Sequence, residues 1–132
     1  MLPEDTISVV SKIKTNRPDA IGFNINGILT SGDVENLYGL FDAEAANQAH
    51  IDLIVIFNEY DGIDWPALFN EDLAKIRAEA FKKLRRYAIV GGPSWFNLAI
   101  EFVRPFGKID TKWFAPEDVA KAWNYIDAKP VS

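Results

Sequence analysis

One segment limits the fold of this chain more than any other, the run Ile51-Asp52-Leu53-Ile54-Val55-Ile56-Phe57. It is apolar on both faces except at Asp52. A strand with two apolar faces is typical of the centre of a parallel sheet, where other layers cover both sides. The segment therefore predicts an α/β domain built around residues 51–57.

The N-terminal part predicts two paired strands. Residues 6–15 and 21–26 alternate between apolar and polar side chains, as strands with one solvated face do. Between them, Asn16-Arg17-Pro18-Asp19 has the composition of a tight turn. Two strands joined by so short a turn are expected to form an antiparallel hairpin.

Apolar residues at helical spacing predict four main helices. Their ranges are 31–47, 69–84, 95–103 and 116–126. Basic residues come near the C-terminal end of the second helix, where cations suit the helix dipole. These residues are Lys82, Lys83, Arg85 and Arg86.

Further strands are predicted at 87–90 and 108–114, which gives the element order β-β-α-β-α-β-α-β-α. Successive βα units with short connections imply a mostly parallel five-stranded sheet with right-handed crossovers. Only the N-terminal hairpin is antiparallel in this scheme. The chain is expected to form a single domain over residues 1–132.

Composition excludes several classes of protein. A net charge of −5 without a basic patch in the sequence argues against binding to nucleic acid. Because there is no cysteine, a disulfide, a thiolate nucleophile and a Cys-built zinc site are excluded. No apolar run approaches the ~18 residues that span a bilayer. The N-terminus lacks the order of a signal peptide, so we expect a cytoplasmic protein.

Several short motifs follow one another in an informative order. They are Gly27-Ile28-Leu29-Thr30, the strand 51–57 with its acidic continuation and Trp65, Arg86-Tyr87-Ala88-Ile89-Val90-Gly91 followed by Trp95, and Trp113-Phe114 with Ala122-Trp123. This succession resembles the SpoIIAA-like family, a branch of the STAS-type superfamily, over nearly the whole chain. The resemblance implies a βα superhelical fold with sequential strands and helices gathered mainly on one side.

The resemblance also implies a comparison of function. Classical STAS proteins relay signals through a Ser after the central strand, whose phosphorylation gates binding to a partner kinase. Here that position reads Asn58-Glu59-Tyr60-Asp61-Gly62 and holds no Ser or Thr. A carboxylate carries less charge and fewer acceptor oxygens than phosphate, so the phosphoswitch is not expected. Some proteins with related folds hold lipids against the sheet, which suggests an apolar ligand by analogy alone.

A binding site is expected at the carboxyl ends of the strands, where α/β sheets gather their ligands. We interpret residues 58–65 as an acidic loop there, and the segment after residue 90 as its neighbour. The predicted ligand- or partner-binding residues are Asn58, Glu59, Tyr60, Asp61, Trp65, Gly91, Gly92, Ser94 and Trp95. Carboxylates, amides and rings bind well but are poorly equipped for nucleophilic attack. We therefore predict no catalytic residue, no metal site and no cofactor.

Other interpretations of the same residues stay open but are less favoured. The acidic residues between 59 and 72 could hold a hard cation, although solvated charges and helix capping explain them. Gly91-Gly92-Pro93-Ser94 could bind an anion at a helix N-terminus, although it matches no phosphate-binding motif. His50, the only histidine, is predicted far from Ser94, which argues against a nucleophile–base pair.

Three functions follow from these residues, in order of preference. The first is a non-enzymatic regulatory or protein-interaction module, with Trp65 and Trp95 as aromatic anchors. The second is a carrier or sensor of a small apolar, lipid-like ligand. The third is an enzyme that depends on carboxylates such as Glu59 and Asp61. A homodimer and a peripheral contact with lipid are further open alternatives, because the helix at 95–103 is apolar almost all round.

Overall fold

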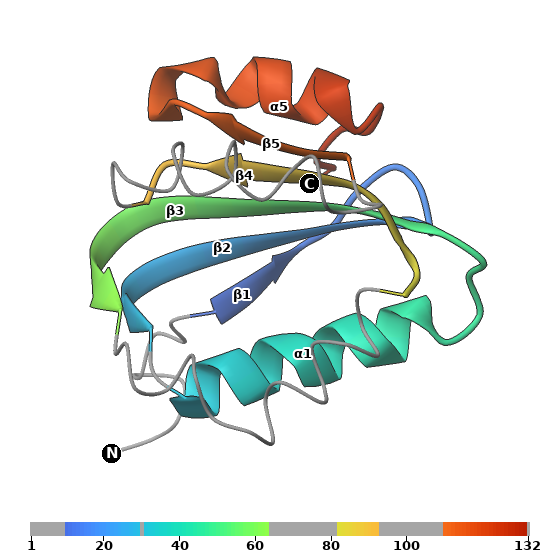
Figure 1. The fold of residues 1–132 in the computed structure, drawn as a ribbon, viewed down its shortest axis with the longest axis horizontal. Coiled ribbons are helices and arrows are strands. Elements are labelled where there is room, and N and C mark those ends of the chain that lie inside the picture. Colours follow the sequence, from blue (N-terminus) through green and yellow to red (C-terminus); the bar gives the residue numbers. More distant parts are fainter. Residues whose placement is uncertain (1–9, 30, 64–81, 93–109, 132) are drawn as a thin grey trace.

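The computed structural model describes residues 10–29, 31–63, 82–92 and 110–131. Within these ranges five strands form one sheet in the order β1-β2-β3-β4-β5, which is also their order in the chain (Figure 1). Their bounds are Val10–Ile13 for β1, Ala20–Leu29 for β2, Ile51–Ile63 for β3, Leu84–Val90 for β4 and Asp110–Phe114 for β5. The five-stranded α/β sheet predicted from the sequence is confirmed.

Strand directions also follow the prediction. β1 pairs antiparallel with β2, and β2–β3, β3–β4 and β4–β5 are all parallel. The β1–β2 turn is held by the hydroxyl of Thr15, whose Oγ1 lies 2.6 Å from the carbonyl oxygen of Ala20 and 2.8 Å from that of Arg17. A side-chain hydroxyl that bonds nearby backbone in this way favours a turn over continued strand.

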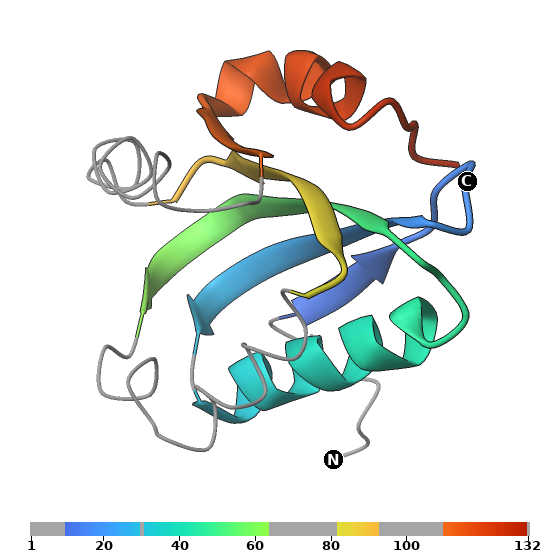
Figure 2. The ribbon, with the colours of Figure 1, turned by 45° about the vertical axis from the view of Figure 1, so that its right-hand side comes forward.

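Helices lie on both faces of the sheet. α1 spans Ser31–Ala45, and a 3₁₀ turn at Pro116–Asp118 leads into α5 at Val119–Tyr125. Figures 1 and 2 show α1 on one face of the sheet and α5 on the opposite face. For these two helices, the one-sided arrangement implied by the resemblance is wrong. Two further helices were predicted at 69–84 and 95–103, and residues 69–81 and 95–103 of these lie outside the described residues.

Two hydrophobic cores follow from the alternation of side chains along β3. Leu53 and Val55 face α1 and pack in a cluster with Phe23 and Phe41. Ile54 and Ile56 point the other way and pack in a cluster with residues of α5 and β4. Since both sides of β3 are buried, the apolar run at 51–57 is explained by helices on each face. Ala122, Trp123 and Ile126, which belong to the last predicted helix, are buried in this second cluster.

β3 is longer than the sequence predicted. Residues 58–63 were expected to form a loop, but they continue β3 and pair with β2 as far as Leu29 and Ile63. Two register shifts between β2 and β3 each leave one residue of β3 without a partner, first Asn58 and then Asp61. Such bulges interrupt the simple alternation of side chains, so a polar, bulged strand has the sequence pattern of a loop.

β4 also begins earlier than predicted. Leu84, Arg85 and Arg86 were assigned to the end of a helix, whereas the structure places them in the first part of β4. Leu84 pairs with Ile51, and the backbone N–H of Ile51 donates to the carbonyl of Lys83 at 2.8 Å. Pairing with the central strand therefore overrides the local helical spacing, as tertiary contacts commonly do.

Two glycines provide a matched test of this packing. A methyl group at Gly22 would lie 3.1 Å from Cβ of Ile13 and 3.2 Å from both Ile54 and Trp123. We expect Gly22→Ala to lower the free energy of unfolding by about 1–3 kcal/mol, because the added carbon overpacks the core under α5. Gly39, in α1, has nothing within 4 Å of such a carbon, so Gly39→Ala should raise stability by about 0.5–1 kcal/mol. Urea titration of both variants checks this, and equal effects of the two would contradict it.

Candidate functional site

A buried carboxylate lies at the amino end of β3. Asp52 is 0 % exposed and is the one buried charged residue among those described. Its carboxylate accepts hydrogen bonds from three guanidinium groups, those of Arg17, Arg85 and Arg86. We call these four residues the arginine–aspartate cluster. A buried charge requires such partners, because an isolated carboxylate in the core would be very costly.

A β-bulge brings two consecutive arginines to the same carboxylate. Neighbouring residues in a regular strand point to opposite faces of the sheet. In the β3–β4 pair, Ile51 is opposite Leu84 but Asp52 is opposite Arg86, so Arg85 is the extra residue of a bulge. A bulge changes the direction of a side chain locally. This explains how Arg85 and Arg86 both reach Asp52.

The hydrogen bonds within the arginine–aspartate cluster are short and two-pronged. Nε and Nη2 of Arg85 lie 3.0 and 2.6 Å from the two oxygens of Asp52, and the same atoms of Arg86 lie 3.1 and 2.7 Å from them. Nη2 of Arg17 donates to Oδ2 of Asp52 at 2.8 Å. Two-pronged guanidinium–carboxylate pairs are among the strongest and most directional ion pairs in proteins.

The cluster sets the protonation of its members. Burial alone would raise the pKa of the Asp52 carboxyl, but hydrogen bonds from Arg85, Arg86 and Arg17 outweigh burial and hold that pKa well below its usual range. For Arg17, burial acts to lower the pKa, and hydrogen bonds to Asp52 and Asp19 raise it overall. Asp52 is therefore a fixed anion near neutral pH, and it cannot act there as a general acid or base.

Two of the arginines also fix the end of α5. Nη1 of Arg86 donates to the carbonyl of Tyr125 at 3.3 Å, and Nη1 of Arg17 donates to those of Ile126 and Asp127 at 2.9 and 2.8 Å. The last carbonyls of a helix have no partners within the helix, so cations there satisfy them. The cluster thereby joins the β1–β2 turn, β3, β4 and the C-terminal segment.

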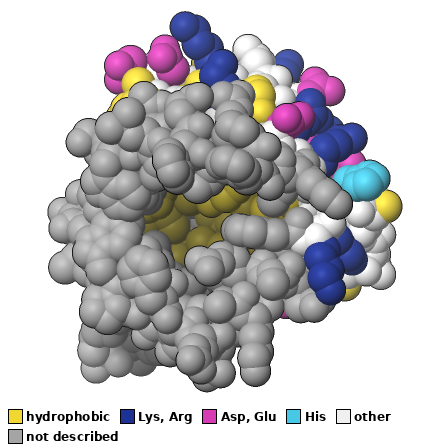
Figure 3. Space-filling model, viewed as in Figure 1, with side chains coloured by type: hydrophobic (Ala, Val, Ile, Leu, Met, Phe, Trp, Pro, Cys, Tyr) yellow, Lys and Arg dark blue, Asp and Glu magenta, His cyan; other side chains and the backbone are white. Residues whose placement is uncertain are grey.

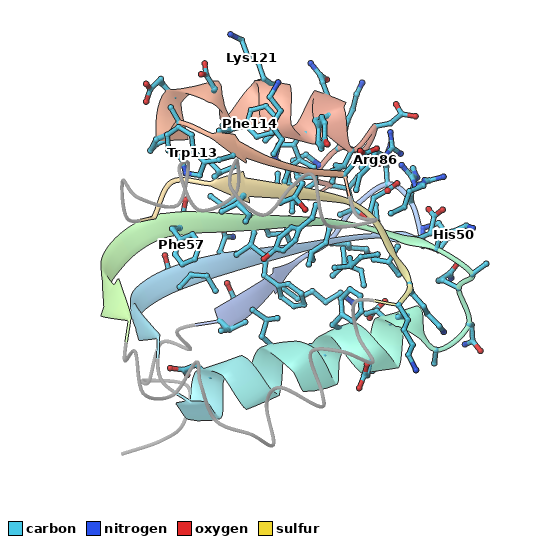
Figure 4. All side chains as sticks on the ribbon, viewed as in Figure 1. His50, Phe57, Arg86, Trp113, Phe114 and Lys121 are labelled. Atoms are coloured by element: carbon cyan, nitrogen blue, oxygen red, sulfur yellow. The ribbon has the colours of Figure 1, made fainter. Side chains whose placement is uncertain are left out.

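The opposite end of the sheet has different chemistry. Figure 4 shows Phe57 and Trp113 at one end of the strands and His50 and Arg86 at the other. The indole Nε1 of Trp113 donates to the carbonyl of Gly91 at 2.8 Å, and the backbone N–H of Gly91 donates to the carbonyl of Phe114 at 3.0 Å. We call this region, formed by Phe57, Asn58, Gly91, Gly92 and Trp113, the carboxyl edge.

Gly91 is required at the carboxyl edge by its backbone. Its φ is +76°, and a side-chain carbon there would lie 3.0 Å from the carbonyl oxygen of Phe57. Gly92 also has a positive φ of 81°. These values favour glycine and bring the chain close to β3 as it leaves β4.

The predicted binding residues are only partly brought together in the described structure. Asn58 is exposed, and its side-chain Nδ2 donates a hydrogen bond to Oδ1 of Asn24 at 2.6 Å. The backbone of Glu59, Tyr60 and Asp61 continues β3 beyond it. Gly91 and Gly92 follow β4 at the carboxyl edge. Trp65, Ser94 and Trp95 lie outside the described residues.

The arginine–aspartate cluster was missed by the sequence analysis, although a signal for it was present. Asp52 is the lone charge in the apolar run 51–57, and a lone buried carboxylate calls for a cation. Arg17 was interpreted as turn composition, and Arg85 and Arg86 as cations at a helix end. The structure instead unites all three, together with four nearby lysines, at the amino end of the sheet. This is a basic patch that the sequence did not reveal.

The described part of the chain shows no other group with evident site chemistry. Within it, no three His, Cys, Asp or Glu residues come together in a way that could hold a metal ion. None of the helices described above is long and apolar enough to cross a membrane.

These features define an α/β domain with a sequential mixed sheet. The SpoIIAA-like family model matches residues 20–127, which include β2 to β5 and both helices. This chain belongs to the SpoIIAA-like family. A comparison with curated proteins finds no match.

A solved structure has a similar fold. It is the crystal structure of an uncharacterized protein of the DUF3478 family with a SpoIIAA-like fold, from Shewanella loihica PV-4. The two chains share 23 % sequence identity and superpose with a TM-score of 0.67, over 92 % of this chain and 96 % of the other. At this identity the comparison supports the fold.

The cluster predicts a specific response to acid. A carboxyl whose pKa is lower in the folded than in the unfolded state stabilises the fold above the unfolded pKa of about 4, and this contribution is lost as pH falls towards the folded pKa. We expect Asp52→Asn to cost on the order of 3 kcal/mol at pH 7, because three arginines lose their buried anion. The free energy of unfolding of the variant should then depend less on pH in the acid range. Urea titrations from neutral pH to acid measure both effects.

An exposed aspartate of α1 serves as the control for this prediction. Asp42→Asn makes the same chemical change at the surface and should alter stability by less than about 0.5 kcal/mol. Equal losses in the two variants, or an unchanged acid response in Asp52→Asn, would show that the cluster does not carry the stability assigned to it.

Proposed function

We propose that this protein is a non-enzymatic regulatory module that binds a partner protein at the carboxyl edge. The single observation that carries the proposal is the chemistry of that edge. Its described side chains are aromatic rings and an exposed amide, which are suited to contact. The described residues there include no nucleophile beside a base. The strongly perturbed carboxylate, Asp52, belongs to the other end of the sheet.

The geometry of the carboxyl edge suits a pre-formed contact surface. Trp113 is held through its indole N–H, and the two glycines fix the course of the chain after β4. Asn58 sits at a bulge of β3 and remains exposed beside this segment. Rigid surface groups lose little entropy on association, so more of their contact energy appears as affinity.

Replacement of Asn58 tests this proposal. We expect Asn58→Arg to reduce recovery of a stoichiometric partner from native lysate by about tenfold or more, because it places bulk and an unpaired charge in the contact. Isotope-labelled co-purification with the full chain measures the recovery.

A second asparagine provides a matched control. Asn124 is exposed on α5, so Asn124→Arg makes the same change away from the carboxyl edge and should leave recovery unchanged. Repeated recovery of the protein alone, or equal recovery with both variants, would contradict the proposal.

A second candidate function, a carrier or sensor of an apolar ligand, has an observation of its own. Figure 3 shows described hydrophobic side chains near the middle of the face seen in Figure 1. Several hydrophobic side chains that pack against the α1-side core are only partly buried. These are Leu37, Leu40, Phe57 and Tyr87. Mainly apolar side chains are typical of the lining of small-molecule sites.

Mass spectrometry distinguishes this candidate from the first. If an apolar ligand binds beside these partly buried side chains, gently denatured protein should release a lipid-like molecule in near-stoichiometric amount. Leu40→Gln should lower that amount, because an amide at the apolar surface weakens binding by about tenfold. Lys121→Gln, on the exposed face of α5, should not change it. Recovery of no lipid above background would remove this function.

A further inference from the structure

Positive charge gathers at the amino end of the sheet, opposite the carboxyl edge. Among the described residues, the strand ends and loops there carry seven Lys and Arg against four Asp, a surplus of three positive charges. The basic residues are Lys14, Arg17, Lys82, Lys83, Arg85, Arg86 and Lys129, and the acidic ones are Asp19, Asp52, Asp110 and Asp127. Because the whole chain has a net charge of −5, this amino edge contrasts with the remainder.

The views of the molecule agree with this distribution. Figure 4 places Arg86 and His50 at the same end of the sheet, and Figure 3 shows Lys and Arg side chains close to that histidine. A local concentration of one sign of charge attracts ions of the opposite sign. The positive charge of the amino edge therefore favours the binding of an anion there, although the protein as a whole is acidic.

Arg85 is the most open arginine of the arginine–aspartate cluster. Its side chain is 45 % exposed, compared with 26 % for Arg86 and 22 % for Arg17. A guanidinium carries five N–H groups. Two of those on Arg85 bond Asp52, and the other three have no hydrogen-bond partner among the described residues. Arg17 and Arg86 direct additional N–H groups to the carbonyls that follow α5.

The buried carboxylate holds the open guanidinium in place. Because Nε and Nη2 of Arg85 are both bonded to Asp52, its orientation is fixed before any ligand arrives. An exposed arginine normally loses side-chain entropy when it binds, and a fixed one loses less. The bulge at Arg85 thus presents a pre-oriented set of donors at the surface.

The chemistry of these donors favours a phosphate group. Guanidinium N–H pairs match the geometry of phosphate oxygens, and nearby ammonium groups add charge. Asp19 and Asp127 act electrostatically on Arg85 and partly offset its charge. The positive charge of the lysines outweighs these two carboxylates at the amino edge. The acidic remainder of the protein disfavours a long polyanion. A compact phosphate ester can bind the positive amino edge without extending over the acidic remainder of the protein.

We propose that Arg85 binds a phosphate group at the amino edge, where Lys82 and Lys83, three and two residues before it, add positive charge. The ammonium of Lys83 also donates to the carbonyl of Ala45 at 2.8 Å, so Arg85 supplies the main contact. A soluble phosphate compound and a phospholipid headgroup present the same chemical group. This site is separate from the carboxyl edge. Phosphate binding here and partner binding there can therefore be tested independently of each other.

Two probes with the full chain test the site and identify its source. Inorganic phosphate is titrated at constant ionic strength, and the Nε–H resonance of Arg85 is followed by NMR. Flotation with vesicles of phosphatidylcholine mixed with phosphatidic acid is compared with flotation on phosphatidylcholine alone. A saturable shift supports a soluble phosphate ligand, and binding only to the acidic vesicles supports a headgroup.

Matched charge removals decide whether the site is specific. Arg85→Gln should weaken the observed binding by about tenfold, because it removes charge-assisted hydrogen bonds to the ligand. Arg17 and Arg86 still pair with Asp52 in this variant, and a thermal melt checks that it folds. If it does not fold, Lys82→Gln decides in its place, with a smaller loss expected. Lys121→Gln, with a side chain 74 % exposed on α5, removes the same charge elsewhere and should have no effect. Binding by neither probe, or equal losses in the site and control variants, would overturn the proposal.

Discussion

The buried carboxylate of Asp52 requires that four separate parts of the chain come together. Three guanidinium groups must reach it, one from the β1–β2 turn and two from β4, and two of them must also reach carbonyls at the end of α5. The described residues leave no buried side-chain nitrogen or oxygen without a hydrogen bond. If the register of β3 shifted by one residue, Asp52 would face the core beneath α1, away from the three arginines that bond it. The carboxylate therefore favours one register of the sheet as well as one position of α5.

The two ends of the sheet carry different kinds of side chain. At the amino end, charged groups are used mainly to hold the fold together, and what remains exposed is positive. At the carboxyl end, the carboxyl edge consists of glycines, aromatic rings and an amide. Parallel strands make this separation natural, because every strand from β2 onward begins at one end and finishes at the other. The proposed partner protein and the proposed phosphate ligand would then bind without competing for the same groups.

Sequence patterns revealed the parts of this fold that depend on local chemistry. The turn at residues 16–19, the helix from Ser31 and the last helix were predicted from turn residues and apolar spacing, and the structure confirms them. The far part of β3 and the start of β4 could not be predicted in this way. At Asn58, Asp61 and Arg85 a bulge breaks the period on which such predictions depend. The arginine–aspartate cluster escaped for a second reason, since its contacts join residues far apart in the chain.

Sheet order has a consequence for synthesis on the ribosome. Each strand joins the one made just before it, so the sheet can grow in step with the emerging chain. Nη1 of Arg17 is an exception, because its acceptors, the carbonyls of Ile126 and Asp127, are 109 and 110 residues away. Closure of that long loop has to wait until residues 126 and 127 have emerged. A nascent sheet that otherwise assembles step by step would thus be joined to the segment after α5 only when all five strands have been made.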